Sequence, residues 1–361
     1  SMDLKCTKAH LLQLSGLLKM VKLSSFIETY DTMLEGKKFK KLEISMGEFV
    51  DEMQKLTFED ESLFGMNNFM ELIEESAVAS SQNIPTGIEE IDKILNSNAY
   101  GKNGGLAKEE LTVVLSGTND GKSLATISIA CNAIRNGQNV LHVNLEGKRL
   151  QAPIRYISNL SNIQYKKLTG LNKKIDGDNE FDSSGYFSSS EMKQIKDAEE
   201  KCGQNLHILH SVKFGENTIE NLCAQVREFS KTKKLDLLVV DSGELLDSLK
   251  RTDSRYQELT VVFNKLDMLA KELKIAVVSP VQSNREGIKH LESDPEECGE
   301  PNQYSRFHIG GSLGIGQVAG CIIGLNRTKD ERKAARLRWS IVKQREGRTN
   351  YQVGIDADFE R

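Results

Sequence analysis

The sequence predicts an α/β protein, with a mostly parallel central sheet flanked by helices and a small all-helical segment in front of it. Two observations predict this fold. From Leu111 onward short apolar runs alternate with helix-length segments, and a glycine-containing loop joins the first run to the first helix. Such alternation is typical of parallel sheets covered by helices on both faces. The composition, 38% hydrophobic and 28% charged with five prolines, is that of a folded chain and excludes extensive disorder.

The first part of the chain is expected to be helical and acidic. Apolar residues recur at helical spacing through residues 4–78, and no strand-like alternation of useful length occurs there. Residues 1–80 carry nine Lys or Arg and fourteen Asp or Glu, whereas residues 326–348 carry nine basic and three acidic side chains. Seventy-odd residues are marginal for an independent core, so two interpretations stay open: a helical cap, or an oligomerisation or docking module.

The strands and helices of the second part follow from apolar runs and from apolar residues repeated every three or four positions. The expected strands are Leu111–Leu115, Val140–Leu145, Leu206–Leu209, Leu235–Asp241, Ile275–Ser279, Cys321–Asn326, Leu337–Val342 and Tyr351–Ile355. The expected helices cover about Lys122–Arg135, Leu150–Leu160, Glu191–Cys202, Ile219–Lys231 and Arg255–Leu273. Residues 163–190 and 283–312 are longer and more polar than ordinary connections, so we interpret them as candidate functional loops.

Apolar runs and cysteine spacing exclude several classes of protein. No run of about 18 apolar residues occurs, so no membrane span is expected. The N-terminus lacks the apolar core of a secretory signal, which indicates a cytoplasmic protein. The six cysteines are scattered without a Cys-x-x-Cys pair, which excludes a zinc ribbon and argues against a disulfide framework.

The most informative motif is a phosphate-binding loop between the first expected strand and the first expected helix. It consists of Ser116, Gly117, Thr118, Asn119, Asp120, Gly121, Lys122 and Ser123. The consensus is G-x-x-x-x-G-K-[ST], so Ser116 replaces the first glycine. Gly121 lets the backbone approach a phosphate, Lys122 reaches the β- and γ-phosphates, and Ser123 is the expected Mg²⁺ ligand. A chance match in a surface turn would lack the flanking strand and helix, so the sequence predicts a nucleotide site.

Carboxylates that follow other strands are expected on the metal side of this site. Asp241 ends a buried strand and is predicted to hold Mg²⁺, directly or through water. Two residues are candidates for the base that activates water, Glu146 and Glu244. Because the C-terminal ends of parallel strands share one edge of a sheet, Glu146 would face the γ-phosphate, and we favour it over Glu244.

These segments, together with several downstream, resemble the RecA-type core of the DnaB-family (superfamily 4) replicative helicases. The matching segments are Pro85–Gly87 with Ile91–Asp92, the phosphate loop, Val143–Glu146, Leu237–Asp241, Ser279–Arg285, Gly310–Ser312, Gln317–Ala319 and Ile341–Gly347. The loop begins with Ser116 and Gly117, and in this feature it is most similar to phage ring helicases, which also have Ser-Gly there. The resemblance implies a RecA-like P-loop core over residues 84–361, a small helical N-terminal domain over 1–66, and a linker helix and linker over 67–83.

The resemblance also implies roles for residues of the site, with ATP and Mg²⁺ as cofactors. Gln282 matches the residue that senses the γ-phosphate, and Arg345 matches an arginine finger that reaches the neighbouring subunit's site, with Lys343 beside it. An arginine fork stabilises charge on the transferred phosphoryl group. The sequence offers Arg345 no carboxylate partner nearby except Glu346, which cannot face the same way on an extended strand. Glu146 and Lys122 complete the expected catalytic set.

Contacts to single-stranded DNA are implied for the segment that begins at Gly310. The family's charged residues are replaced over Leu313–Gly316, but backbone amides of a glycine-rich loop can still bind phosphates. The expected DNA contacts are Gly310, Gly311, Ser312, Lys250, Arg251, Arg285, Lys289 and Arg306. Tyr256 and Tyr304 are expected to pack on their own loops rather than stack on bases.

The function implied by the resemblance is an ATP-dependent replicative DNA helicase. It would assemble as a ring, expected to be a hexamer, translocate on single-stranded DNA and unwind duplex, in a bacterial or phage-infected cell and with a primase or helicase loader as a further partner. Two alternatives stay open: a RecA-type strand-exchange ATPase, and an ATP-binding ring scaffold with little turnover. The segment Ile341–Gly347 favours the helicase over strand exchange, and the full catalytic set argues against the scaffold.

Overall fold

The computed structural model describes residues 74, 78, 82–96, 104–170, 186–210, 217–250, 252–292, 303–310, 313–345, 347–349 and 351–358. The chain divides into two units, Ser1–Glu74 and Glu75–Arg361, and the fold described here is that of the second. The predicted N-terminal domain and linker helix lie outside the described residues, except for Glu74 and Val78, which are helical. The predicted boundaries at 66/67 and 83/84 therefore stay predictions.

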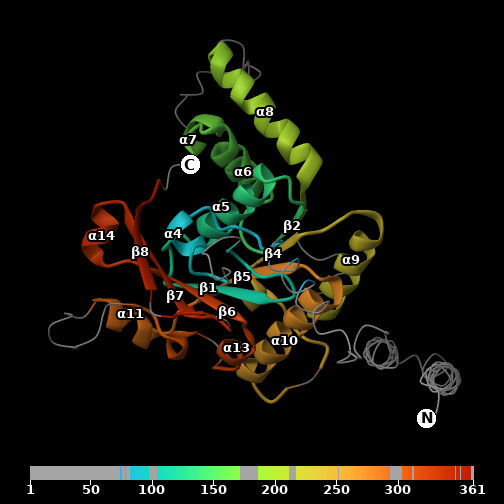
Figure 1. Cartoon of the computed structure of the whole chain (residues 1–361), viewed down its shortest axis with the longest axis vertical. Coiled ribbons are helices and arrows are strands. Elements are labelled where there is room, and N and C mark those ends of the chain that lie inside the picture. The colour runs from blue at the N-terminus through green and yellow to red at the C-terminus, as the bar shows by residue number, and fades with distance from the viewer. Residues whose placement is uncertain are drawn as a thin grey trace, which may run out of the picture. The chain divides into compact units, whose positions relative to one another are not determined.

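A single sheet of eight strands forms the centre of the described part (Figure 1), in the order β3-β2-β4-β5-β1-β6-β7-β8. The strands are β1 Leu111–Ser116, β2 Val140–Asn144, β3 Leu206–His210, β4 Leu237–Asp241, β5 Ala276–Gln282, β6 Cys321–Asn326, β7 Arg336–Lys343 and β8 Tyr351–Asp356. Neighbours from β3 to β6 pair in parallel, whereas β7 and β8 form an antiparallel edge. The predicted mostly parallel sheet is confirmed.

Two groups of helices cover the two faces of the sheet. Along β1 the side chains alternate, with Val113 and Leu115 facing one core and Val114 the other. The first core packs against α9 (Ile219–Thr232), α10 (Arg255–Leu273), α11 (Arg285–Glu292) and α13 (Leu313–Val318). The second packs against α4 (Glu89–Asp92), α5 (Lys122–Arg135) and α6 (Gln151–Ser161). Because both faces are covered, all six β1 residues are buried.

The long helices begin and end close to the predicted positions. The bounds of α5 and α10 are as predicted, and α10 starts where the Ser254 side chain accepts the Gln257 N–H. The remaining helices are α7 Tyr165–Leu168, α8 Ser189–Asn205 and α14 Lys329–Lys333, with 3₁₀ turns at Gly243–Leu245 (η3) and Arg306–His308 (η4). The sequence pattern missed α4, α7, α11, α13 and α14, because helices of four to eight residues carry too little periodicity.

Strand β5 is longer than predicted and continues through Pro280 to Gln282. Pairing with β4 ends at Val278, whereas pairing with β1 continues to the end of the strand. The proline nitrogen lies on the side of β5 where β4 no longer pairs, so no hydrogen bond of the sheet is lost. This extension brings Gln282 level with Ser116, at the start of the phosphate loop.

The candidate loops 163–190 and 283–312 contain helical segments in their described parts, so they are not plain connections. The first contains α7 and the start of α8, and the second contains α11 and η4. Among the residues that the structure describes, no helix has both the length and the apolar character needed to cross a bilayer.

Candidate active site

The phosphate loop connects the end of β1 to the start of α5, in the centre of the sheet. Gly121, the residue before the helix, has a φ of 90°, a conformation that glycine adopts without strain. The following helix therefore directs its first amide groups, and the positive end of its dipole, toward the loop. This arrangement is suited to binding an anion such as a phosphate group.

The predicted metal-side residues lie together. Asp241 ends β4 with 4% of its surface exposed, and the Ser123 hydroxyl forms a hydrogen bond with its carboxylate. Burial raises the pKa of Asp241, while the Ser123 hydrogen bond and the Lys122 charge oppose that rise. Carboxylate and hydroxyl oxygens are ligands that Mg²⁺ prefers, so the residues present fit the predicted ion.

Both candidate bases lie close to this site. Glu146 follows β2 and is exposed, whereas Glu244 is half-buried in η3 and accepts the backbone N–H of Gln282 at 2.9 Å. Burial raises the pKa of Glu244, and the Glu244 carboxylate interacts electrostatically with Lys122 and with Glu146. Since Glu244 is engaged with the backbone of β5, Glu146 stays the favoured base.

Gln282 joins three parts of the site at the end of β5. Its side-chain amide donates to the Thr118 hydroxyl at 2.6 Å, which ties it to the phosphate loop. Its backbone N–H donates to Glu244, and its carbonyl accepts the N–H of Gly310 at 2.7 Å. A Cβ at position 310 would overlap that carbonyl oxygen, so the close approach requires glycine. The loop predicted to sense the nucleotide is thus bonded directly to the start of the predicted DNA-binding segment.

Arg345 lies at the N-terminal ends of the parallel strands, whereas the phosphate loop of its own chain lies at their C-terminal ends. It follows β7, which runs antiparallel to β6, so the end of β7 lies beside the start of β6. Its guanidinium pairs with Glu110 at 3.3 Å and with Asp267 at 3.9 Å, and 47% of the side chain is exposed. The prediction that Arg345 lacks a carboxylate partner in its own chain is therefore wrong. Its distance from the phosphate loop agrees with an action on another subunit.

Lys343 was predicted as part of the catalytic set, but its side chain is hydrogen-bonded to the C-terminal end of α13. Its ammonium donates to the carbonyls of Gly316, Gln317 and Ala319 at 3.0, 3.1 and 2.6 Å. Carbonyls at a helix C-terminus lack partners within the helix, and a cation there also complements the helix dipole. Burial lowers the pKa of Lys343. Within its own chain this residue is a helix cap that connects β7 to α13.

Replacing Lys343 with methionine should therefore lower the free energy of unfolding by about 2 kcal/mol, because three carbonyls lose a charged donor. The matched control is Lys333→Met, since Lys333 is exposed and pairs with Asp330 across one turn of its own helix. That control should change stability by less than about 0.5 kcal/mol. Urea denaturation of both variants measures the difference, and equal losses would contradict the capping role.

The predicted DNA-binding cations that the structure describes are all exposed. They are Lys250 before α10, Arg285 and Lys289 one turn apart on α11, and Arg306 in η4. Arg251, Gly311 and Ser312 lie outside the described residues.

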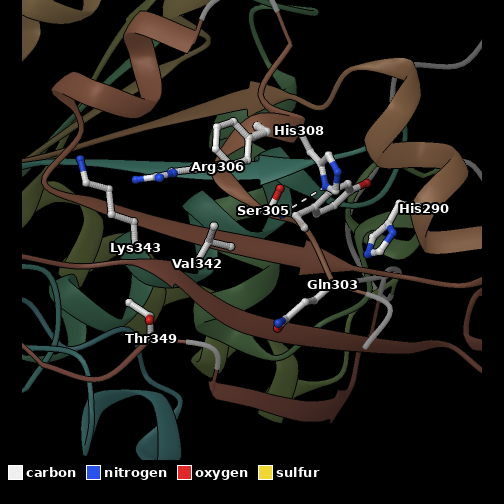
Figure 2. Close-up of a pocket in the computed structure, with 10 residues that line it drawn as sticks. His290, Gln303, Ser305, Arg306, His308, Val342, Lys343 and Thr349 are labelled. Carbon is white, nitrogen blue, oxygen red and sulfur yellow. Dashed lines mark hydrogen bonds between the residues drawn. The ribbon is translucent and has the colours of Figure 1, made fainter. Parts of the chain in front are cut away.

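Arg306 and Lys343 lie on one side of a pocket of about 670 Å³, with His290 and His308 on the other (Figure 2). The guanidinium of Arg306 lies 5.0 Å from the ring centre of Phe307, an exposed aromatic side chain that the sequence reading missed. Two different elements, η4 and β7, thus bring cationic groups to one surface hollow.

The two tyrosines that could have stacked on bases behave differently. Tyr304 is 2% exposed and its hydroxyl is hydrogen-bonded to Ser283, so the prediction that it packs is confirmed. Tyr256 is 44% exposed, and its hydroxyl accepts the backbone N–H of Leu313 at 2.8 Å. That bond holds the start of α10, next to the loop with Lys250, against the start of α13.

The sequence reading also missed a second contact to the phosphate loop, from α14. Arg332 forms a two-pronged ion pair with Asp120, the fifth residue of the loop. Strand-end reasoning places α14 at the same end of the sheet as the loop, because α14 follows the C-terminal end of β6. It does not indicate which basic side chain of α14 reaches the loop, because that depends on β6 lying beside β1.

The strand order β3-β2-β4-β5-β1-β6, with a phosphate loop after β1 and a buried aspartate at the end of β4, is that of a RecA-like P-loop fold. The family model of the DnaB-like helicase C-terminal domain matches residues 83–357, and the chain belongs to this family. The resemblance inferred from the motifs is confirmed.

Individual relatives agree with this assignment. The chain is 22% identical over 232 residues to the replicative DNA helicase DnaB of Helicobacter pylori, which covers 61% of this chain and 43% of that protein. It is 25% identical over 275 residues to DnaB of Leifsonia xyli, covering 75% and 53%. The chain thus spans about half the length of the curated relatives it matches.

Solved structures are similar in fold. One of them, a separately solved ATPase domain, superposes with a TM-score of 0.63 at 17% identity, covering 82% of this chain and 96% of that one. A DnaB-like replicative helicase, described together with its interactions with primase, has a TM-score of 0.66 at 17% identity and covers 99% and 78%.

Proposed function

We propose that this protein is an ATP-dependent replicative DNA helicase that assembles as a ring, expected to be a hexamer, and hydrolyses ATP at its subunit interfaces. The observation that carries the proposal is the junction at Gln282. One residue is bonded to Thr118 of the phosphate loop and to Gly310 at the start of the candidate DNA-binding segment. A change at the γ-phosphate would reach the DNA segment through these bonds without an intervening element.

Each part of the site has a role in the proposed reaction. The loop Ser116–Ser123 binds the phosphates of ATP, and Ser123 and Asp241 hold Mg²⁺. Glu146 takes the proton of the attacking water as general base. Arg345 acts on the neighbouring subunit, which its position at the far edge of the sheet supports. Lys343 supports Arg345 by fixing the end of β7 against α13.

The test of the proposed function is steady-state ATP turnover with and without single-stranded DNA, together with unwinding of a forked duplex. A ring helicase turns over ATP faster with DNA and unwinds the fork. Exchange of homologous strands without unwinding would indicate the RecA-type alternative, and nucleotide binding without turnover would indicate the scaffold. A primase or loader partner, and a bacterial or phage-infected cell as the setting, belong to the same proposal.

Contacts made mainly to phosphates predict a single-strand affinity that falls steeply with salt and varies little with base sequence. Arg306→Ala should reduce the slope of log affinity against log salt by about 0.7, the value for one phosphate contact on a single strand. Lys231→Ala is the matched control, because Lys231 is an exposed lysine on α9 that pairs with Glu228. Fluorescence anisotropy at several salt concentrations measures both slopes. Strong sequence preference with a flat salt response would contradict phosphate binding.

A further inference from the structure

A carboxylate lies within the phosphate loop itself. Asp120 directly precedes Gly121 and Lys122, and only 2% of its surface is exposed. A buried carboxylate is little screened by solvent. Without compensation, this negative charge would oppose the binding of phosphate groups at the same loop.

Arg332 supplies the compensation. Its Nε donates to one Asp120 oxygen at 2.9 Å and its Nη2 to the other at 3.1 Å, the paired geometry in which arginine binds carboxylates most strongly. The Arg332 side chain is 38% exposed, so it stays in contact with solvent while its head reaches the buried loop. Hydrogen bonding to Asp120 is the main reason that the pKa of Arg332 is raised.

The helix that carries Arg332 is held in place from both sides. Helix α14 begins with a capping box between Thr328 and Glu331, and Glu331 also accepts from Arg338 of β7 at 2.6 Å. Arg327, which directly follows β6, donates to the carbonyl of Arg332 at 3.1 Å. Glu292 at the end of α11 is a second, more distant carboxylate, 3.8 Å from Nη1 of Arg332. The pair with Asp120 is therefore preorganised before any ligand arrives.

We propose that Arg332 is a positioning residue of the nucleotide site, which cancels the charge of Asp120 so that the phosphate loop can accept an anionic ligand. The proposal rests on the proposed function only in requiring that this loop binds a nucleotide. Arg332 acts through Asp120 and does not touch the nucleotide. A pair that served packing alone would change stability without changing affinity in any order set by charge.

The test uses the net charge of the pair as its variable. The unaltered pair is neutral, Arg332→Met leaves it at −1, Asp120→Asn leaves it at +1, and the double variant is neutral again. Affinity for a non-hydrolysable ATP analogue with Mg²⁺, measured by calorimetry, should rise as the net charge of the pair goes from −1 through 0 to +1. Arg332→Met should weaken binding about tenfold or more, Asp120→Asn should tighten it several-fold, and the double variant should return to within about threefold of the unaltered protein.

A second readout separates charge from packing. Because the repulsion grows with the charge of the ligand, the Arg332→Met loss should be larger for the ATP analogue than for ADP. Arg336→Met is the matched control, since Arg336 is an exposed arginine on β7 that pairs with the exposed Asp356. It should leave both affinities unchanged.

Each outcome decides the proposal. Equal affinities for Arg332→Met and the unaltered protein, or an Asp120→Asn variant that binds ATP more weakly, would overturn it. Should Arg332→Met fail to fold, the tightening by Asp120→Asn and the near-normal double variant still decide. If the unaltered protein binds neither nucleotide, the proposed function fails, whereas normal binding with no charge order removes the role of Arg332 alone.

Discussion

Arg345→Ala is expected to lower ATP turnover by about 10³–10⁵-fold while ATP binding stays close to normal, as for the loss of an arginine finger. The side chain lies at the opposite ends of the parallel strands from its own phosphate loop, so it cannot reach that site. It would act instead on the site of a neighbouring subunit. Turnover and equilibrium binding of an ATP analogue measure the two parts of the prediction. Glu110→Gln is the control, because it breaks the ion pair of Arg345 within the chain but keeps the arginine.

Mixing two inactive variants tests whether Arg345 acts between subunits. Arg345→Ala keeps an intact phosphate loop, whereas Lys122→Ala keeps an intact arginine beside a disabled loop. Mixed rings contain some interfaces at which an intact loop meets an intact arginine, so ATPase activity should partly return once subunits exchange. A linked dimer of the two variants fixes their arrangement. If exchange is verified and neither the mixture nor the linked dimer regains activity, either Arg345 acts within its own subunit or hydrolysis requires intact interfaces in succession.

Glu146→Gln should leave ATP binding near normal and reduce turnover by about 10²–10⁴-fold, the contribution typical of a general base. Glu146 is exposed at the C-terminal ends of the parallel strands, where the phosphate loop also lies, and its charge acts on both Asp241 and Glu244. The amide keeps the shape of the side chain but cannot take a proton from water.

Glu244→Gln is the matched comparison. Its carboxylate accepts the backbone N–H of Gln282, and an amide oxygen can still accept that bond, so turnover should fall by less than about tenfold. Single-turnover experiments on both variants measure the rate of the hydrolysis step itself, without a contribution from product release. A large loss for Glu244→Gln beside a small one for Glu146→Gln would reverse the assignment of the base.

Much of the fold follows from local sequence pattern. The bounds of α5, α10 and β6 agree with the prediction because each contains a dense apolar repeat between clear start and end signals. Strand-end reasoning also identified Asp241 and Glu146 as residues of the site. Asp241 and Gln282 end neighbouring strands of the same sheet, and Ser116 lies level with Gln282. For Asp241, knowing that the strands are parallel is enough to predict its place, whereas Gln282 was assigned from the family resemblance because its strand was expected to end at Ser279.

The partners of the charged side chains are another matter. Arg345 pairs with Glu110, and Arg332 pairs with Asp120 across 212 positions of the sequence. The periodicity of apolar residues predicts only which residues share a face of one helix or strand. These ion pairs depend instead on β1 lying beside β6 and on β7 running antiparallel to β6. The sequence thus sufficed to identify the RecA-like core and its family. Which basic side chain faces the phosphate loop, and which caps a helix or faces the far edge, depended on strand order, a property of the folded chain as a whole.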